Sequence, residues 1–311
     1  GGVRDVRGRA RGMTYKAAVA GLDLGGGKAG IIGDRSIKKE ALFRAFGRHI
    51  ASLGGRYITA EDMNTSVQDM SWIRRETQWV TGQDKMAGGS GDPSPVTAWV
   101  TYQGIRACLE VVYGSPDVSG RTVAIQGIGS VGFHLARFLH EAGAKLLYSD
   151  VNQRRLRSAT EQFGGRVISQ EEFYRTECDV LAPCAIGGII NARTIPMLRA
   201  PIIAGAANNQ LDDEIRDGEA LEKAGITYAP DYVINAGGLI NVYAELKKLR
   251  KRLENLERCT DEDEAAAEAA KIRARQSQVS RLMQSKLNKV QQLVQPMMAE
   301  TIETCKDLVA S

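Results

Sequence analysis

The sequence has few of the residues that build disulfide frameworks and metal sites. Its five cysteines are scattered over 311 residues without a CxxC pair, and only three histidines are present. His134 and His140 fall in a predicted helix, and none of the three histidines lies beside a cysteine or an acidic cluster. We therefore expect reduced thiols in a cytoplasmic protein, no metal ion, and no histidine-centred catalysis.

Long hydrophobic runs and a strong net charge are also missing. No apolar stretch approaches the roughly 20 residues that a membrane helix needs. The net charge of +4 is too small to favour binding to nucleic acid. Hydrophobic residues make up 43% of a chain that is long enough for two domains. We therefore expect a globular protein without a membrane or nucleic-acid partner.

Glycine and proline clusters divide the chain into three parts. Residues 1–92 end in the turn-rich "MAGGSGDPSP" and are predicted to form a first domain. Residues 93–245 alternate short apolar strands with helices, which is typical of a parallel sheet covered on both faces. Residues 246–311 are predicted to be helical. The sequence thus predicts an α/β fold with a first domain, a Rossmann-type domain and a helical C-terminal segment.

A glycine fingerprint lies at the start of the predicted sheet. The strand "TVAIQ" is followed by "GIGSVG", which gives Gly127, Gly129 and Gly132 the GxGxxG spacing, and Asp150 ends the next strand. Gly127 would permit the tight turn, Gly129 would let the backbone approach a pyrophosphate, and Gly132 would let the helix pack closely. Asp150 would bind the adenosine ribose hydroxyls and repel a 2′-phosphate, which favours NAD over NADP.

Two alternatives to this interpretation remain open. Arg154 and Arg155 follow Asp150 closely and are able to accommodate a 2′-phosphate, which would permit NADP. The second alternative is that Gly127, Gly129 and Gly132 only permit a turn and bind no cofactor. The strand, turn and helix around them favour the cofactor site.

A second glycine cluster, "AGLDLGGGKAGIIGD", runs directly into Lys28. It does not fit a phosphate-binding loop, because Leu22 stands where the first glycine belongs and Ala29 follows the lysine. Glycines beside a lysine permit its burial, and burial favours the neutral amine, which can accept a proton. Lys16 lies in a predicted short helix before the cluster. From spacing alone, a surface position is the more common interpretation for each lysine.

Several motifs in order resemble one known family. "GMTYKAAVAGLDLGGGKAGIIGD", "GRYITAEDMNTSVQDM", "GDPSPVTA" and "YAPDYVINAGGLINV" are similar to the leucine, valine and phenylalanine dehydrogenases of the wider glutamate dehydrogenase superfamily. The likeness covers roughly residues 12–245 and is strongest to the leucine-type members. It implies NAD-dependent oxidative deamination of an L-amino acid to a 2-oxo acid and ammonia.

The resemblance implies that residues 1–92 form the substrate domain, and it implies roles for three residues on the substrate side. Lys16 of "MTYK" would bind the substrate carboxylate, and Lys28 of "GGGK" would be the catalytic base. Asp62 of "TAED", after the predicted strand "RYIT", would relay protons to the substrate nitrogen. Ala60 is small and no extra charge accompanies it, so we expect a branched-chain aliphatic substrate.

The resemblance also implies contacts on the cofactor side. Thr97 of "PSPVTA" would contact the nicotinamide carboxamide, and Asn209 would lie near the nicotinamide ribose. Asn235 of "INAGG" would lie where cofactor and substrate meet, and we count it with the substrate-binding residues. Cys184 and Ala185 belong to a turn, "APCA", that lines the cofactor.

The sequence departs from the family pattern at both ends. The family carries a sizeable N-terminal segment that is missing before "GMTYK", so we expect part of the substrate pocket and of the subunit-contact sheet to be lost. After residue 245 no family motif is recognisable. There Leu246, Leu249, Leu253 and Leu256 form a coiled-coil-like stripe, which would serve either as a cap on the first domain or as a self-association helix.

The predicted function is reversible, NAD-dependent oxidative deamination of a leucine-like amino acid by a homo-oligomeric enzyme. One alternative is a catalytically silent NAD-binding scaffold or regulatory subunit with the same fold. The retention of Lys16, Lys28, Asp62 and Asn235 argues against it. The other is a hydroxyacid-type dehydrogenase, which would need a histidine acid/base that no motif contains.

Overall fold

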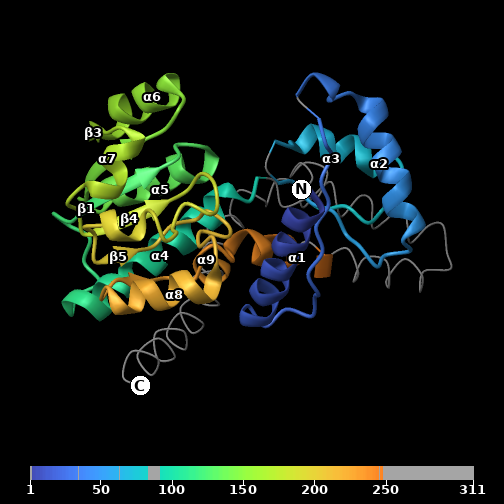
Figure 1. Cartoon of the computed structure of the whole chain (residues 1–311). Helices are drawn as coiled ribbons and strands as arrows, with labels where there is room; N and C mark the ends of the chain where they lie inside the picture. Colours follow the sequence, from blue (N-terminus) through green and yellow to red (C-terminus); the bar gives the residue numbers. More distant parts are fainter. Residues whose placement is uncertain (1, 34, 63, 83–91, 245, 248–311) are drawn as a thin grey trace. The chain divides into compact units, whose positions relative to one another are not determined.

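The computed structural model describes residues 2–33, 35–62, 64–82, 92–244 and 246–247 (Figure 1). The chain divides into two compact units. Among the described residues, the sheet unit comprises 2–32 and Pro93–Ile240, and the small unit comprises Gly33–Asp92 and the described residues after Ile240. Each unit is described by itself.

A six-stranded parallel sheet is the centre of the sheet unit (Figure 1). Its strands are β1 Thr122–Gln126, β2 Lys145–Ser149, β3 Arg166–Val167, β4 Val180–Pro183, β5 Ile202–Ile203 and β6 Thr227–Tyr228. They follow the order β3-β2-β1-β4-β5-β6, which confirms the predicted doubly wound Rossmann-type sheet. Because the order reverses between β1 and β4, the carboxyl ends of these two strands border the crevice where such folds bind ligands.

Helices cover both faces of this sheet. On one face lie α4 Ser94–Tyr113, α5 Ser130–Glu141 and α6 Gln153–Phe163; on the other lie α7 Gln170–Arg175, the short helix η3 Ile195–Met197 and α8 Glu214–Lys223. Side chains alternate along β1, so that Val123 and Ile125 join the first core and Ala124 joins the second. All of these strand side chains are fully buried, as the β-branched sequence predicted.

The two ends of the helix that precedes the sheet are built from glycine and proline. Helix α4 ends at Gly114, with that glycine in the left-handed conformation (φ +72°). Its N-cap is Pro93, and no side-chain hydrogen bond caps it. Proline at the start of a helix is tolerated because its missing N–H has no intrahelical partner there.

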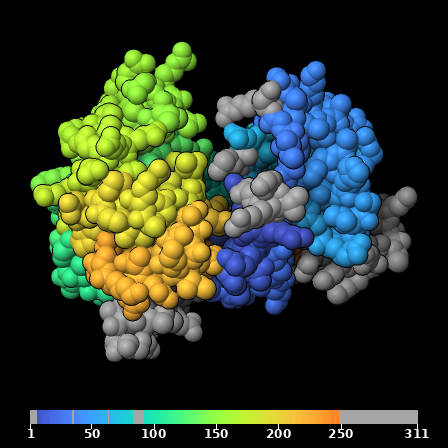
Figure 2. Space-filling view, in the orientation of Figure 1, coloured from blue at the N-terminus to red at the C-terminus, as the bar shows by residue number. Residues whose placement is uncertain are grey.

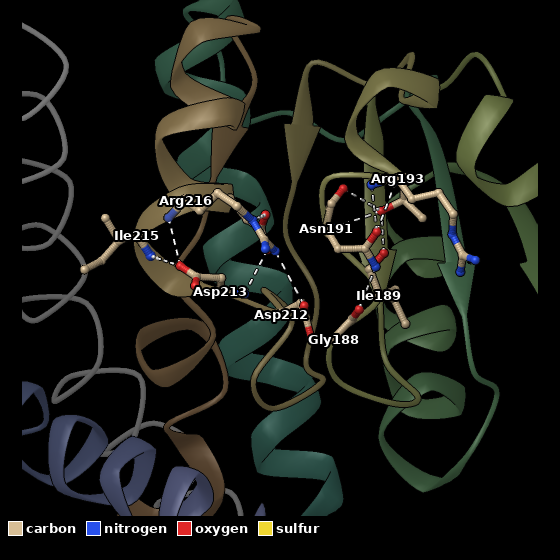
Figure 3. A network of polar contacts seen from close by, with 10 residues as sticks. Gly188, Ile189, Asn191, Arg193, Asp212, Asp213, Ile215 and Arg216 are labelled. Carbon is tan, nitrogen blue, oxygen red and sulfur yellow. Dashed lines mark hydrogen bonds and ion pairs between the residues drawn. The ribbon is translucent and has the colours of Figure 1, made fainter.

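Short side-chain hydrogen bonds brace the loops that leave the sheet (Figure 3). Asn191 accepts hydrogen bonds from the backbone N–H groups of Arg193 and Thr194 and donates one to the Gly188 carbonyl. Asp213 caps α8 by accepting from the first-turn N–H groups. These loops follow β4 and β5, so the bracing fixes the segments that carry Ala185 and Asn209.

Helix α1, Gly2–Val19, belongs to the sheet unit. We expected it to belong with residues 33–92, because the sequence grouped residues 1–92 into one domain. It packs on the short helix α9, Asp231–Ile234, with the rings of Tyr15 and Tyr232 5.6 Å apart. Arg11 pairs with Glu214 at 2.7 Å. In Figure 2 the dark blue surface of α1 lies beside the orange surface of the segment that holds α8 and α9.

The helical segment is also longer than the short helix predicted around "MTYK". Gly8 and Gly12 lie inside it, at positions four residues apart on one face. A Cβ atom on Gly12 would lie 3.3 Å from Asn209 Oδ1, and one on Gly8 would lie 3.9 Å from Asn209 Nδ2. The two glycines therefore mark the face of α1 that the Asn209 loop approaches.

The small unit contains helices α2 Glu40–Ser52 and α3 Val67–Arg74 after the short helix η1 Arg35–Ile37. Phe43, Met70, Ile73 and Val80 form its buried cluster. The predicted strand "RYIT" is wrong: among the described residues only Thr59 of this segment makes a bridge, to Val80, and no continuous partner strand extends the pairing there.

The predicted helical tail from residue 246 lies outside the described residues, except for residues 246–247. Within the described part of the chain, no helix is both long and apolar enough to cross a membrane. The described cysteines, Cys108, Cys178 and Cys184, are thiols, and the cytoplasmic location stays a prediction.

Candidate active site

The glycine turn after β1 has the geometry that its spacing predicts. Gly127 has φ +93°, and a Cβ atom there would lie 2.7 Å from the Ala185 Cβ. A Cβ on Gly132 would overlap the Gly127 carbonyl oxygen. Helix α5 can therefore pack this closely against the turn only because position 132 is glycine. At Gly129, by contrast, the only atom within 4 Å of an added Cβ among the described residues is Arg155 Nη1, at 3.9 Å. The turn is therefore closely packed at Gly127 and Gly132, and it has an open side at Gly129.

The open side coincides with the N-terminus of α5. Its N-cap is Gly129, so no side chain accepts from the N–H groups of the first turn, and that turn contains no acidic residue. Such an N-terminus offers unsatisfied N–H groups and a partial positive charge to a phosphate. The residues present therefore fit the pyrophosphate of a dinucleotide.

Asp150 is tied to the same turn in a way that the sequence did not predict. Its Oδ2 accepts a hydrogen bond from the Ile128 N–H at 2.6 Å, and its Oδ1 accepts one from the Asn152 N–H at 2.7 Å. Asn152 in turn caps α6. The carboxylate thus holds the glycine turn in place in addition to marking the end of β2.

The "APCA" turn packs against the glycine turn. Cys184 donates its N–H to the Gln126 carbonyl at 2.7 Å, and its Cβ would lie 3.5 Å from a Cβ on Gly132. Desolvation raises the pKa of the Cys184 thiol to about 12, so the thiol stays protonated and has no thiolate chemistry. Cys184 and Ala185 are therefore placed beside the expected cofactor path as packing residues.

Two further motif residues lie close together at the start of α4. The Thr97 hydroxyl donates to the Pro93 carbonyl at 3.0 Å. A Cβ atom on Gly238 would lie 2.7 Å from the Thr97 hydroxyl oxygen. Gly238 belongs to the same "INAGG" motif as Asn235, which is only 4% exposed. Asn235 donates to the Ala206 carbonyl at 3.0 Å and to Asn208 Oδ1 at 2.8 Å.

Lys16 joins this amide network from α1. Its side chain is 7% exposed, and Nζ donates to Asn208 Oδ1 at 3.0 Å. Asn208 Oδ1 therefore accepts from both Lys16 and Asn235, two residues for which the family resemblance implies substrate binding. Asn208 itself was missed, because an asparagine pair in a loop carries no spacing signal.

The second glycine cluster brings Lys28 to the same place. A Cβ on Gly26 would overlap the Ala10 carbonyl oxygen and the Thr14 hydroxyl, so the chain after α1 can run back along that helix only with glycine there. Lys28 follows two residues later and is half-buried, which is less burial than we expected. The glycines serve close approach to α1 and do not enclose the lysine.

Lys16 and Lys28 line one pocket of the sheet unit, with about 290 Å³ of empty space that includes open solvent. The other lining residues are Arg9, Gly12, Met13, Asn208, Asn209 and Asp231. Arg9, Met13 and Lys16 share a face of α1 at i, i+4 and i+7. Three of the lining residues, Lys16, Lys28 and Asn209, were expected to be functional. The charged and amide residues Arg9, Asn208 and Asp231 were missed.

Asp62 belongs to the small unit, where it is exposed in a turn closed by Thr65. Its neighbour Glu61 is half-buried, and the pKa of Glu61 is raised by burial and by the charges of Asp92 and Asp69. Within the described residues no cluster of histidine, cysteine, aspartate and glutamate side chains is suited to a metal ion.

Known proteins match this chain at the level of sequence and fold. The family model for the Glu/Leu/Phe/Val dehydrogenase dimerisation domain matches residues 2–79, and that for glutamate/leucine/phenylalanine/valine dehydrogenase matches residues 146–303. The second match continues beyond residue 245, where we expected the likeness to end.

Individual relatives agree with the family models. The chain is 52% identical over 259 residues to a leucine dehydrogenase of Geobacillus stearothermophilus, which covers 80% of this chain and 70% of the relative. It is 53% identical over 245 residues to a leucine dehydrogenase of Bacillus subtilis (strain 168), which covers 78% and 67%. The crystal structure of L-tryptophan dehydrogenase from Nostoc punctiforme superposes with a TM-score of 0.65 at 38% identity, covering 98% of this chain and 85% of that one. Together with the sheet order and the motifs, these matches show that the chain belongs to the Glu/Leu/Phe/Val dehydrogenase family.

Proposed function

We propose that this chain catalyses the reversible oxidative deamination of a branched-chain aliphatic L-amino acid, with NAD as the oxidant. The observation that carries the proposal is the pocket in which Lys16 and Lys28 meet the amide side chains of Asn208 and Asn209. Two lysines and a carboxylate around one opening suit a substrate that carries both a carboxylate and an amino group. The identity to leucine dehydrogenases supports the substrate class.

Lys16 is proposed to bind the substrate carboxylate. Its ammonium group is buried and already oriented by the hydrogen bond to Asn208, so little side-chain entropy remains to be lost when a carboxylate binds. A charge-assisted hydrogen bond of this kind contributes about 1.5–3 kcal/mol. Asn235, which shares the Asn208 oxygen, keeps that amide in its orientation.

Lys28 is proposed to act as the general base. After hydride has left the substrate Cα, the resulting iminium carbon is attacked by water, and the side-chain nitrogen of Lys28 accepts the proton that the water gives up. The carbinolamine then collapses to the 2-oxo acid and ammonia. The proton transfers to nitrogen in this scheme are assigned to Asp62, on the strength of the "TAED" motif.

The glycine turn is proposed to hold the cofactor. The α5 N-terminus and the open side at Gly129 would take the pyrophosphate, while Asp150 would face the adenosine ribose. Thr97 and Asn209 are assigned to the nicotinamide end. Bound NAD supplies the acceptor for the hydride. The carboxylate of Asp150 supports NAD over NADP, because it would repel a 2′-phosphate.

The match to a dimerisation domain supports an oligomeric protein, and we propose that the oligomer contains copies of this chain alone. L-Amino acid, 2-oxo acid and ammonia are the small molecules that it would bind.

The test is NADH formation, followed by absorbance, with L-leucine, L-valine, L-isoleucine and L-phenylalanine, each with NAD and with NADP. We expect turnover with the branched substrates and NAD. Lys28→Ala should lower kcat by about 10³, within the range that a general base supplies. Lys16→Ala should raise KM for the amino acid by roughly 10- to 100-fold, which corresponds to the loss of one charge-assisted hydrogen bond.

Lys145→Ala is the matched control, because Lys145 is exposed at the start of β2 and lines no part of the pocket. It should leave kcat and KM within twofold of the parent protein. Absence of turnover with every amino acid, together with measurable NADH binding, would refute the enzymatic proposal and support the silent scaffold.

A further inference from the structure

Asp231 is the one carboxylate among the described residues that line the pocket. It begins α9, three residues after β6, and both of its oxygens are engaged. Oδ2 accepts a hydrogen bond from the Asn209 N–H at 2.7 Å, and Oδ1 accepts one from the Tyr228 hydroxyl at 3.3 Å. The side chain is thus fixed from two directions.

The hydrogen bond to Asn209 holds an unusual backbone conformation. Asn209 has φ +52°, in the left-handed region that residues other than glycine rarely occupy, although asparagine tolerates it better than most. Its carbonyl accepts from the Gly188 N–H at 2.7 Å, so the residue is held on both sides. Its side chain points at Gly12 of α1. Asp231 therefore fixes the residue at which the sheet loop meets α1.

The charge of Asp231 opposes the cations around the pocket. Arg9, Lys16 and Lys28 line it alongside this single carboxylate. Burial raises the pKa of Asp231, while the Asn209 N–H and the positive charge of Lys16 both act to lower it. Lys16 and Asp231 therefore lie close enough to interact electrostatically, and Asp231 offsets part of the positive potential that a bound substrate experiences.

We propose that Asp231 is a positioning residue that holds Asn209 for the cofactor and balances the pocket charge, so that a zwitterionic amino acid binds as well as an anionic 2-oxo acid. This inference rests on the proposed function of the same pocket. A 2-oxo acid carries one negative charge, whereas the amino acid also carries an ammonium group. Loss of the Asp231 charge should therefore affect the two substrates in opposite directions.

Two substitutions separate the two roles. Asp231→Asn keeps an oxygen that can accept from the Asn209 N–H but removes the charge, and Asp231→Ala removes both. For Asp231→Asn we expect the KM for the amino acid to rise about fivefold, the KM for the 2-oxo acid to fall about threefold, and the NADH Kd to stay within twofold. For Asp231→Ala we expect the NADH Kd to rise at least fivefold as well.

The matched control is Asp212→Asn, which neutralises an exposed carboxylate of the Asn209 loop that pairs only with Arg216 among the described residues. It should leave both KM values within twofold. KM changes of the same sign for both substrates, or no change, would overturn the charge role. An NADH Kd that rises as much in Asp231→Asn as in Asp231→Ala would overturn the separation of roles.

Failure of this inference can be told from failure of the proposed function. If the parent protein turns over amino acids and only the Asp231 variants behave otherwise than expected, the function stands and the inference falls. Thermal unfolding of each variant, read beside the kinetics, identifies a substitution that has merely unfolded the protein. Asp231→Asn keeps the shape of the side chain, so it tests the charge role even if Asp231→Ala does not fold.

Discussion

The two glycine clusters of the sheet unit look alike in sequence and do different things in the structure. In "GIGSVG" the middle glycine, Gly129, faces open space beside the N-terminus of α5. In "GGGK" the middle glycine, Gly26, is pressed against the backbone of α1. One cluster leaves room for a ligand, and the other lets two chain segments touch. A glycine pattern shows that side chains are excluded, but only the tertiary contacts show what excludes them.

The strongest test of this difference is Gly26→Ala. Its methyl group would overlap the Ala10 carbonyl oxygen, which is backbone and cannot swing away. We expect a loss of about 3 kcal/mol in the free energy of unfolding, measured by urea denaturation, and loss of activity because Lys28 is displaced. Gly25→Ala is the matched control, since no described atom lies within 4 Å of an added Cβ there. It should change stability by less than about 0.5 kcal/mol. If Gly26→Ala instead kept full stability and lost only activity, both clusters would be ligand-facing.

Gly132→Ala should have the next largest effect. The methyl group would meet the Gly127 carbonyl oxygen and push α5 away from the strand. We expect a loss of about 2 kcal/mol in stability, as for other overpacked sites, and a rise of at least tenfold in the NADH Kd measured by fluorescence titration. Unchanged NADH binding in a destabilised variant would show that the helix position does not set the phosphate site.

Gly129→Ala should have the smallest effect on stability and a selective effect on binding. Because only Arg155 approaches the site among the described residues, stability should change by less than about 0.5 kcal/mol. The added methyl group would stand where the backbone meets the pyrophosphate, so the NADH Kd should rise about tenfold. Equal NADH affinity in the variant and the parent protein would contradict the assignment of the open side to the cofactor.

Much of the sheet unit follows from local sequence. Apolar, β-branched runs such as "TVAIQ" can be satisfied only as buried strands, and the helical segments between them enforce parallel pairing. The parallel sheet, and hence the fold class, followed from that alternation and from the family motifs, whereas the strand order came from the structure. The strand predicted for "RYIT" failed because a strand needs a partner, and beyond the bridge at Thr59 none is present in the described residues.

The candidate site divides in the same way. The residues of the glycine turn could be singled out from their spacing between a strand and a helix, whereas Lys16 and Lys28 were singled out only by the resemblance of their motifs to a family. Arg9, Asn208 and Asp231 gained their significance from distant parts of the chain, since Asn208 and Asp231 stand about 200 positions from α1. Their pairing depends on how α1 docks on α9, which no local pattern encodes.

The sequence by itself determined the alternation of strands and helices, the two glycine clusters and the family, because these depend on side-chain volume, periodicity and backbone freedom along the chain. Only the tertiary structure decided that Gly26 touches α1, that Asp150 holds the glycine turn, and that Asp231 lines the same pocket as Lys16. The physical reason is that charge balance and close approach depend on distances between atoms, and folding sets those distances between residues far apart in sequence.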